Sequence, residues 1–513
     1  MGWLLSAVAS TFTPSWTTSA LIVIVVAAAL VARRHQKPKG FPPGPPGLPI
    51  VGNVFAFGTN DAFAETLMQW GKDYGPVYSV RIGFSNDVVV CGADMIKTLL
   101  VKKGLDFADK PHLIEADLYN KGRRGIFVSH CREGWEHQRR FAHTTLRGMG
   151  FGKVVLEPVI REEVQDTIKQ FKSFAGQPFD PRESLATNSS NIICRLTFGR
   201  RFEHNDPEFH QLLTYLRGIM GFRAEGEVMV FPVLRHLYAQ KTRWRTRLES
   251  NRNMFKYFGA KIDEHRVGLC ERTRTGSEEP DVLDFIDAYL VQARADPVNF
   301  NDEELKVVLS DLFIAGSDTV STTISWAILY MAAYPDIQKS VYEEIKQVVG
   351  EESVCLSHRG ALPYSEATLM ELQRLASVVP INPRAAFTDS ELGGYHIPRG
   401  TRVWINMWSL FRDPVEWPQP HRFDPTRFLN KDGSKVIHRD SFLPFSAGRR
   451  VCMGEQLAKM ELFLFFMSIM QHFEFVFPDP QSKPSFLGVV GLNRQPEPFL
   501  VKAIPRMEQG AYQ

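Results

Sequence analysis

The feature that most constrains this chain is a ten-residue segment near its carboxyl end, residues 445–454 (FSAGRRVCMG), in which Cys452 stands between two glycines. A helical pattern of apolar residues begins directly after it, so Cys452 lies near a predicted helix amino terminus. The helix dipole and the two preceding arginines, Arg449 and Arg450, both favour a thiolate there. A single thiolate without a neighbouring Cys or His is a poor zinc site and a good axial ligand for one haem iron. A buried free cysteine is the alternative interpretation.

The spacing of this segment, F-x-x-G-x-R-x-C-x-G, fixes five positions, and a chance match is on the order of 10⁻⁴ at average residue usage. The segment resembles the signature of the cytochrome P450 haem-thiolate monooxygenases. The resemblance implies that Cys452 ligates the iron of haem b. It also implies the fold of that family, which is mostly α with a small β-rich subdomain.

A second motif lies upstream of the cysteine segment. Glu371 and Arg374 form an E-x-x-R pair on one helix face, and P-T-R-F at residues 425–428 resembles the family's P-E-R-F element with Thr in place of Glu. On the residues alone, such a pair is most often a solvated surface ion pair. The resemblance implies instead that Glu371, Arg374 and Arg427 form a buried charge network with a structural role.

A third motif, W-x-x-x-R, places Trp135 and Arg139 one helical turn apart. An indole N–H and a guanidinium in this arrangement can both donate to one haem propionate. A buried Trp and a surface Arg on an ordinary helix are the alternative. The resemblance adds two more propionate contacts, so that the predicted haem-binding residues are Trp135, Arg139, Arg384, Arg450 and Cys452.

A fourth motif, A-G-S-D-T at residues 315–319, lies in the middle of a predicted helix over residues 302–334. Gly, Ser, Asp and Thr are poor residues for a helix interior, and such a local conflict indicates function. Small residues leave room for a ligand, and Thr or Asp can loosen backbone hydrogen bonds. In the family this element binds dioxygen and delivers protons, so the resemblance implies that Thr319 and Asp318 are catalytic. An incidental Ser/Thr-rich patch is the alternative.

The amino-terminal segment predicts a membrane anchor. Residues 2–32 carry no charged side chain, and their apolar stretch is long enough to cross a bilayer once as a helix of about 20 residues. Arg33, Arg34, Lys37 and Lys39 follow, which predicts a single pass with the body in the cytosol. A cleaved secretory signal is the alternative, although no basic stretch precedes the apolar one. Proline-rich residues 41–49 then predict a stiff linker. We therefore expect a membrane anchor at 1–32, a basic and Pro-rich linker at 33–49 and a haem-thiolate monooxygenase domain at 50–513.

The body reads as one large, mostly helical domain. Dense β-branched residues predict strands at 77–82, 88–90 and 403–406. Apolar periodicity predicts helices at 161–174, 242–265, 302–334 and 335–349. Pro and Gly cluster between residues 414 and 448, which indicates a long irregular stretch.

Charge and cysteine usage exclude other classes of protein. A net charge of +3 gives no field that would indicate nucleic acid, so we expect no nucleic-acid partner. Six scattered cysteines without a C-x-x-C pair exclude a disulfide scaffold and a zinc finger.

No dinucleotide-binding fingerprint is evident, so electrons must come from another protein. The resemblance implies NADPH–cytochrome P450 reductase at the endoplasmic reticulum membrane, with cytochrome b5 as a further candidate partner. Candidate docking residues are Arg140, Arg449 and Lys459.

The resemblance also implies the reaction. Residues 449–463 and 311–316 are similar to the animal microsomal clan-2 branch, and residues 141–147 and 191–194 to its long-chain fatty acid hydroxylases. We therefore expect one oxygen atom from O2 to be inserted into a lipophilic substrate (a long-chain fatty acid, a steroid or a xenobiotic) using NADPH. A haem-thiolate isomerase or dehydratase of lipid peroxides and a haem-based sensor or lipid-binding protein are the alternatives.

The apolar run at 228–234 either dips into the bilayer or is core. By family position the resemblance implies a substrate cavity lined by Phe127, Phe313, Ala315, Val379, Ile381 and Leu492, and ordinary core residues are the alternative interpretation.

Overall fold

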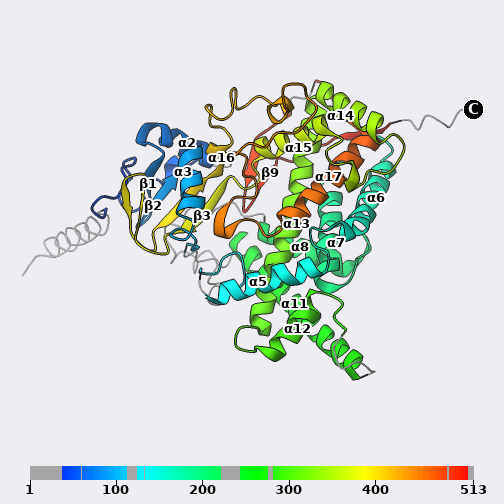
Figure 1. Cartoon of the computed structure of the whole chain (residues 1–513), viewed down its shortest axis with the longest axis horizontal. Coiled ribbons are helices and arrows are strands. Elements are labelled where there is room, and N and C mark those ends of the chain that lie inside the picture. The colour runs from blue at the N-terminus through cyan, green and yellow to red at the C-terminus, as the bar shows by residue number, and fades with distance from the viewer. Residues whose placement is uncertain are drawn as a thin grey trace, which may run out of the picture.

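The structure is a computed structural model that describes residues 37–58, 61–111, 124–131, 133–220, 243–274, 281–481 and 484–506. The predicted anchor, the first residues of the linker and the apolar run at 228–234 lie outside these residues. Figure 1 shows a smaller part rich in strands beside a larger part built of helices. The predicted mostly α architecture with a small β-rich part is therefore confirmed.

The main sheet joins segments from both ends of the chain in the order β1-β2-β6-β3. β1 (Val77–Ile82) and β2 (Ser85–Val90) form an antiparallel hairpin. β2 pairs in parallel with β6 (Arg402–Asn406), and β3 (Ile381–Ala385) pairs with the other edge of β6. The strands predicted at 77–82, 88–90 and 403–406 are confirmed. Helices α2 (Ala62–Tyr74), α3 (Ala93–Lys97) and α16 (Met407–Leu410) pack beside this sheet.

The linker runs along the edge of this sheet in an extended form. Its described residues, 37–49, include no helix, as the prolines predicted. The backbone N–H of Ser79 in β1 donates to the carbonyl of Pro43 (2.7 Å), and the Ser79 hydroxyl donates to that of Pro42 (2.8 Å). A Cβ at Gly44 would lie 1.8 Å from the carbonyl oxygen of Ser79, so only glycine fits at this crossing.

The helical part surrounds one long helix, α13 (Asp302–Ala333). This helix packs against α7 (Arg182–Phe198), α11 (Arg243–Arg274), α15 (Pro363–Ala376) and α17 (Glu455–His472). The outer helices are α5 (Glu133–Gly148), α6 (Glu157–Ser173), α8 (Pro207–Met220), α12 (Phe285–Ala295) and α14 (Pro335–Val348). The four predicted helices are confirmed as α6, α11, α13 and α14, although α6 begins earlier and α11 ends later than predicted.

Among the described residues, α13 is the one helix long and apolar enough to cross a membrane. Its most apolar window is 72% buried inside the protein, which is how the central helix of a folded domain behaves. Asn301 caps its amino terminus, with the side-chain oxygen accepting from the backbone N–H of Glu304 (3.1 Å). α13 is therefore the centre of the hydrophobic core.

The stretch between α16 and α17 is irregular, as the Pro and Gly cluster predicted. Within residues 414–448 it contains the short turn η5 (Pro425–Phe428) and the start of η6 (Gly448–Arg450). Three two-stranded sheets complete the fold: β4 (Ser390–Leu392) with β5 (Tyr395–Ile397), β7 (Phe473–Val476) with β10 (Lys502–Pro505), and β8 (Gly488–Val490) with β9 (Arg494–Pro496).

Candidate active site

Cys452 lies in the turn between η6 and α17, as predicted. Its backbone N–H donates to the carbonyl of Phe445 (3.0 Å), which closes the loop. Gly448 has a φ of +73°, and a Cβ there would lie 1.9 Å from the carbonyl oxygen of Leu100, so the turn requires glycine. Cys452 is exposed, whereas α17 is buried from Met460 to Met470, so Cys452 is accessible to a ligand.

Although Cys452 is exposed, the protein atoms packed around its thiol desolvate the sulfur and raise its pKa, while the backbone N–H of Gly454 and the charge of Arg139 act in the opposite direction. The expectation that Arg449 and Arg450 would favour the thiolate is wrong. Arg449 forms an ion pair with Glu136, and Arg450 donates to backbone carbonyls on the other side of the loop. A metal cation at the sulfur would supply the positive charge that these arginines do not.

Three predicted haem-binding arginines, Arg139, Arg384 and Arg450, converge on the cysteine loop. Arg139 donates to the carbonyl of Val451 (2.6 Å), and Arg384 donates to that of Arg450 (3.5 Å). In the described part of the chain, the hydrogen-bond partners of all three are backbone carbonyls and the side-chain oxygen of Asn382. Burial and mutual repulsion lower the pKa of Arg384 to about 9 and that of Arg450 to about 10. The cluster therefore holds positive charge that no ion pair with a described carboxylate offsets.

Trp135 is buried beside this cluster and its indole N–H donates to the carbonyl of Ile126 (3.0 Å). The guanidinium of Arg450 lies over the indole ring, 3.9 Å from the ring centroid. The indole N–H that the sequence analysis assigned to a haem propionate therefore donates to a backbone carbonyl of the protein in this structure. Arg139, with one hydrogen bond in the described residues, keeps open N–H groups.

Lys110 adds a fourth buried cation that the sequence did not single out. Its ammonium donates to the carbonyl of Pro383 (3.3 Å) and lies 4.7 Å from the ring centroid of Phe127. Burial and the charges of Arg384 and Arg450 lower the pKa of Lys110 well below its ordinary value. No pattern could have found it, because Lys110 lies in a loop without a motif or a period.

The A-G-S-D-T motif lies in α13, which continues through residues 315–319 without a break. The predicted loosening of the backbone is therefore absent from this structure. The hydroxyl of Thr319 donates to the carbonyl of Ala315, one turn earlier (2.8 Å). Ala315 is exposed although Leu312 and Phe313 before it are buried, so α13 presents a small residue to open space at this point.

Asp318 is held by a different element from Thr319. Its carboxylate accepts from the side-chain amides of Asn493 (2.8 Å) and Gln495 (3.0 Å), in and beside β9. Burial raises the pKa of Asp318, and these two amides act in the opposite direction. Sequence reasoning missed both amides, because the contact joins positions far apart in the chain.

The predicted cavity-lining residues divide into two groups. Phe127, Val379 and Leu492 are 48%, 39% and 40% exposed, respectively, so their apolar side chains are open to a ligand. Ile381 is half-buried. The prediction that Phe313 lines the cavity is wrong. Its side chain is fully buried and packs edge-on against Phe258 with ring centroids 6.3 Å apart, so Phe313 belongs to the core between α11 and α13.

The predicted charge network is confirmed. Arg374 donates to both oxygens of Glu371 (2.7 and 2.8 Å), and Arg427 lies 3.3 Å from the same carboxylate. Glu371 and Arg374 are fully buried. Arg374 also donates to the carbonyls of Phe411 (2.6 Å) and Pro420 (2.8 Å), so the network ties α15 to the irregular stretch that leads to Cys452.

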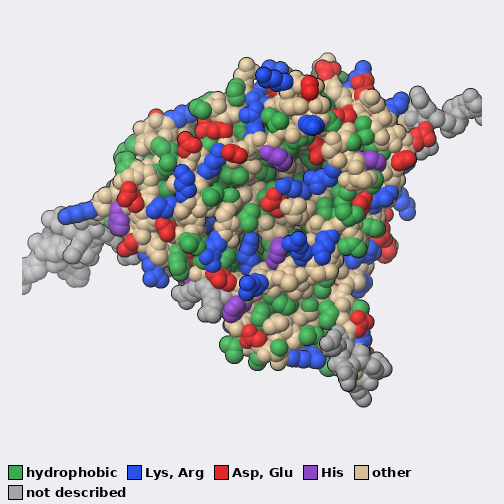
Figure 2. Space-filling model, in the orientation of Figure 1, with side chains coloured by type: hydrophobic (Ala, Val, Ile, Leu, Met, Phe, Trp, Pro, Cys, Tyr) green, Lys and Arg blue, Asp and Glu red, His purple; other side chains and the backbone are tan. Residues whose placement is uncertain are grey.

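The candidate docking residues lie on the surface around the cysteine loop. Arg140 is exposed, Arg449 pairs with Glu136, and Lys459 pairs with Glu455 (2.6 Å). Figure 2 shows Lys and Arg side chains gathered across the middle of the face on which α5 and α17 lie in Figure 1.

The residues around Cys452 fit a haem group. An accessible thiol suits a single iron, and three guanidinium groups without carboxylate partners among the described residues suit two propionates. The exposed Ala315 and the exposed apolar side chains suit a flat, largely apolar ring.

Comparison with known proteins gives one consistent result. The family model described as Cytochrome P450 matches residues 42–503. Cytochrome P450 2J5 of Mus musculus is 37% identical over 515 residues, which cover 98% of this chain and 99% of the relative. Cytochrome P450 2J2 of Homo sapiens is 36% identical, with 92% and 93% covered, and Cytochrome P450 2U1 of Bos taurus is 36% identical, with 90% and 88% covered.

Proposed function

The chain belongs to the cytochrome P450 family, and from this membership we propose which of its residues perform the reaction and on which substrates. It is a haem-dependent monooxygenase that acts on lipophilic substrates with electrons from NADPH delivered through a reductase. Bound haem supplies the activation of O2 and the transfer of one oxygen atom to the substrate. The observation that carries the assignment of residues is the accessible thiol of Cys452 beside three arginines that have no carboxylate partner in the described chain.

We propose that the thiol of Cys452 would hold the haem iron, and that Arg139, Arg384 and Arg450 would hold the two propionates. Trp135 holds Arg450 in place by stacking against its guanidinium. These arginines form no ion pair with a described carboxylate, and Arg384 is buried. This supports the assignment, because a buried cation without an ion-pair partner is unfavourable and a propionate would offset its charge.

Thr319 and Asp318 are the proposed proton-delivery residues. The Thr319 hydroxyl lies one turn from the exposed Ala315 and would hold a proton at Oγ1 on the side of α13 that faces the haem site. Burial raises the pKa of Asp318, which favours a carboxyl that holds a proton more readily than a solvent-exposed one. Asn493 and Gln495 orient the Asp318 carboxyl, and Asp318 therefore passes its proton to Thr319 through solvent and not by direct contact.

The proposed substrate is a long-chain fatty acid, with steroids and xenobiotics as the other lipophilic classes. Exposed Phe127, Val379 and Leu492 support an apolar chain as the ligand, because they exclude water and offer no charged group. Product chemistry separates these classes.

The proposed location is the endoplasmic reticulum membrane, with residues 1–32 as the single-pass anchor, 33–49 as the linker and 50–513 as a cytosolic domain. NADPH–cytochrome P450 reductase and cytochrome b5 are the proposed redox partners. Arg140, together with the cations on the face in Figure 2, supports docking of an acidic protein near the cysteine loop.

The decisive experiment measures both the ligation of haem iron and the enzymatic activity of the same variants. The ferrous–CO complex of the full-length protein should show the red-shifted Soret band of thiolate ligation, and Cys452→Ser should lose this band. A lipid extract incubated with enzyme, reductase and NADPH should yield products heavier by one oxygen atom, with hydroxy fatty acids prominent. The Cys355→Ser variant, which changes a cysteine outside the site, is the matched control and should behave as wild type. An unchanged spectrum in Cys452→Ser would refute the ligand assignment.

A further inference from the structure

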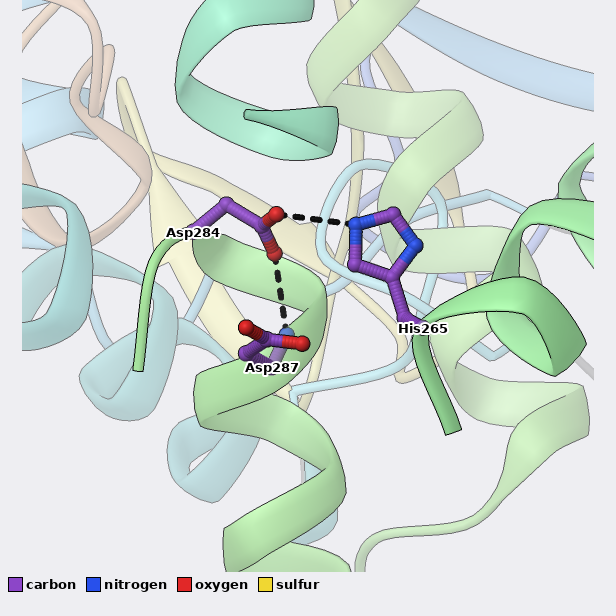
Figure 3. Close-up of side chains that lie close together, drawn as sticks. All are labelled: His265, Asp284 and Asp287. Carbon is purple, nitrogen blue, oxygen red and sulfur yellow. Dashed lines mark hydrogen bonds and ion pairs between the residues drawn. The ribbon is translucent and has the colours of Figure 1, made fainter. Parts of the chain in front are cut away.

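A second group of ligand-type side chains lies where α11 meets the start of α12 (Figure 3). His265 projects from α11, Asp284 caps the amino terminus of α12, and Asp287 lies in the first turn of α12. One donor atom from each of the three lies within 4.8 Å of the other two. Asp284 and Asp287 are 4% and 0% exposed, and the His265 side chain is 15% exposed. None of these residues has a part in the haem site.

The partners around this group hold each side chain with one donor atom turned toward the others. Nδ1 of His265 lies 2.7 Å from the carbonyl oxygen of Lys261, which requires a proton on Nδ1 and directs Nε2 toward Asp284. One carboxylate oxygen of Asp284 accepts from the backbone N–H of Asp287 (3.0 Å). One oxygen of Asp287 is held by Arg272 and by the backbone N–H of Leu283 (3.2 Å). Metal ligands are oriented by outer partners of this kind.

The remaining oxygen of Asp287 is the observation that indicates a ligand. Oδ1 is buried and has no hydrogen-bond partner within the described residues. A buried carboxylate oxygen without a partner is strongly unfavourable, and a cation is the group that satisfies it best.

The end of α7 packs closely against this group. Gly199 ends α7 with a φ of +63°, and a Cβ at this position would lie 2.8 Å from Oδ2 of Asp284, so only glycine allows the backbone to approach the carboxylate this closely. The partly exposed edge of His265 gives a path from solvent.

We propose that His265, Asp284 and Asp287 bind one divalent transition-metal ion, and that zinc is the ion this donor set fits best. One imidazole nitrogen and two carboxylate oxygens are zinc ligands, and a water molecule completes the tetrahedron. Calcium and magnesium prefer oxygen ligands alone. Tetrahedral zinc ligands lie about 3.4 Å apart when each bond is about 2.1 Å long, and the three donor atoms lie within 4.8 Å of one another, so the widest pair must close by at most about 1.4 Å. The ion replaces the proton that Nε2 shares with Asp284 and ties α11 to α12.

The competing interpretation is a purely structural contact, in which protonated His265 pairs with Asp284 at 2.8 Å. Such an ion pair connects the same two helices without a metal. Only the metal-site interpretation predicts that the protein retains one zinc per molecule. It also predicts that this retention is lost when Asp287 is changed.

The test uses the full-length holoenzyme, equilibrated by dialysis against zinc chloride and assayed for zinc per haem iron. Wild type should retain one zinc, and Asp287→Asn and His265→Gln should each bind it at least about tenfold more weakly. Asp281→Asn and His210→Gln, which change exposed residues of the same types nearby, are the matched controls and should retain it. The proposal is overturned if wild type does not retain zinc, or if Asp287→Asn and His265→Gln retain as much zinc as wild type.

A second measurement separates metal loss from misfolding. The ferrous–CO spectrum and the unfolding midpoint without zinc report whether each variant is folded. Added zinc should raise the midpoint of wild type and controls but not of folded site variants, because a ligand that binds only the native state stabilises it. Crystals soaked in zinc should give an anomalous peak at its absorption edge between the three side chains. A peak only elsewhere overturns the proposal even if zinc is retained.

Discussion

At the scale of single residues, Arg384 shows how the unfavourable burial of one side chain indicates what a chain binds. Arg384 is 3% exposed, and its guanidinium meets carbonyl oxygens and the Asn382 side chain but no described carboxylate. Burial and then the charges of Arg450 and Arg139 lower its pKa to about 9. A residue whose burial weakens its own charge is retained because a partner stabilises that charge, and the proposed partner is a propionate.

We therefore expect Arg384→Gln to loosen haem. The change removes one charge-assisted hydrogen bond, worth about 1.5–3 kcal/mol, so haem should dissociate about tenfold to a hundredfold faster. Transfer of haem to an excess of an apo-globin, followed by absorbance, measures this rate. The apo-protein should unfold at the same or a higher temperature, because a buried cation has been removed. Arg399→Gln, an exposed site, is the control. Equal rates in the two variants would contradict the role of Arg384.

The Thr319 hydroxyl is the second residue-scale case. Thr319→Ala should leave haem content and substrate binding near wild type, because one hydroxyl bonded to the carbonyl of Ala315 is removed. General acid–base groups contribute about a hundredfold or more to proton transfer, so product per NADPH should fall severalfold and hydrogen peroxide should rise. Thr319→Ser keeps the hydroxyl and should remain coupled. If Thr319→Ala couples as wild type does, Thr319 is only a helix residue.

At the scale of elements, Asp311 connects α13 to the loop that carries Phe127. One of its carboxylate oxygens accepts from the backbone N–H groups of Ile126 (2.7 Å) and Phe127 (2.9 Å). Glu304, two turns earlier, accepts from the backbone N–H of Gly125 (2.7 Å). These bonds give the loop an orientation that its own sequence does not provide, and they fix Phe127 at the open space beside α13.

Asp311 also gives this connection a pH dependence. Burial raises the pKa of Asp311 to about 6, above its ordinary value of 3.8. A carboxyl with a raised native pKa contributes stability below its unfolded pKa and loses it as pH rises through the native pKa. The free energy of unfolding of wild type should therefore fall by about 2 kcal/mol relative to Asp311→Asn as pH rises from about 4 to about 6.

Denaturant titrations at several pH values measure this difference, with the exposed Asp73→Asn variant as control. Above about pH 7, where Asp311 is ionised in both the native and the unfolded state, the two curves should run parallel. Curves that are parallel across the whole range would show that Asp311 does not titrate there.

Elements with strong local patterns were predictable, and contacts between distant elements were not. Strand β1 and helix α14 follow the β-branched run and the apolar period that predicted them. The cysteine turn was found because its glycines and Cys452 are adjacent in sequence. The direction of Arg450, away from the sulfur, and the contact of Asp318 with Asn493 depend on tertiary packing, and no local pattern encodes that packing.

At the scale of the whole molecule, the linker fixes where the predicted anchor joins the body. The backbone N–H of His396 in β5 donates to the carbonyl of Gly40 (2.9 Å), and Arg81 in β1 donates to that of Gly47 (2.6 Å). The linker is therefore held on the strand-rich part along much of its length. An anchor that enters the bilayer ahead of residue 37 would place this part beside the membrane and fix the tilt of the helical part.

This arrangement predicts that the anchor and the haem site are separable. Deleting residues 1–32 should greatly reduce sedimentation with membranes and leave the ferrous–CO spectrum unchanged, because every proposed haem contact lies between Trp135 and Cys452.

Protease added outside sealed microsomes should digest the body of the full-length protein. Glycosylation is a poor reporter here, since Asn188 of the N-S-S sequon is buried in α7 and donates to the hydroxyl of Thr167 (2.6 Å). Protease therefore decides the topology. A protected body would place the domain in the lumen, where a cytosolic reductase could not reach the cations around the cysteine loop.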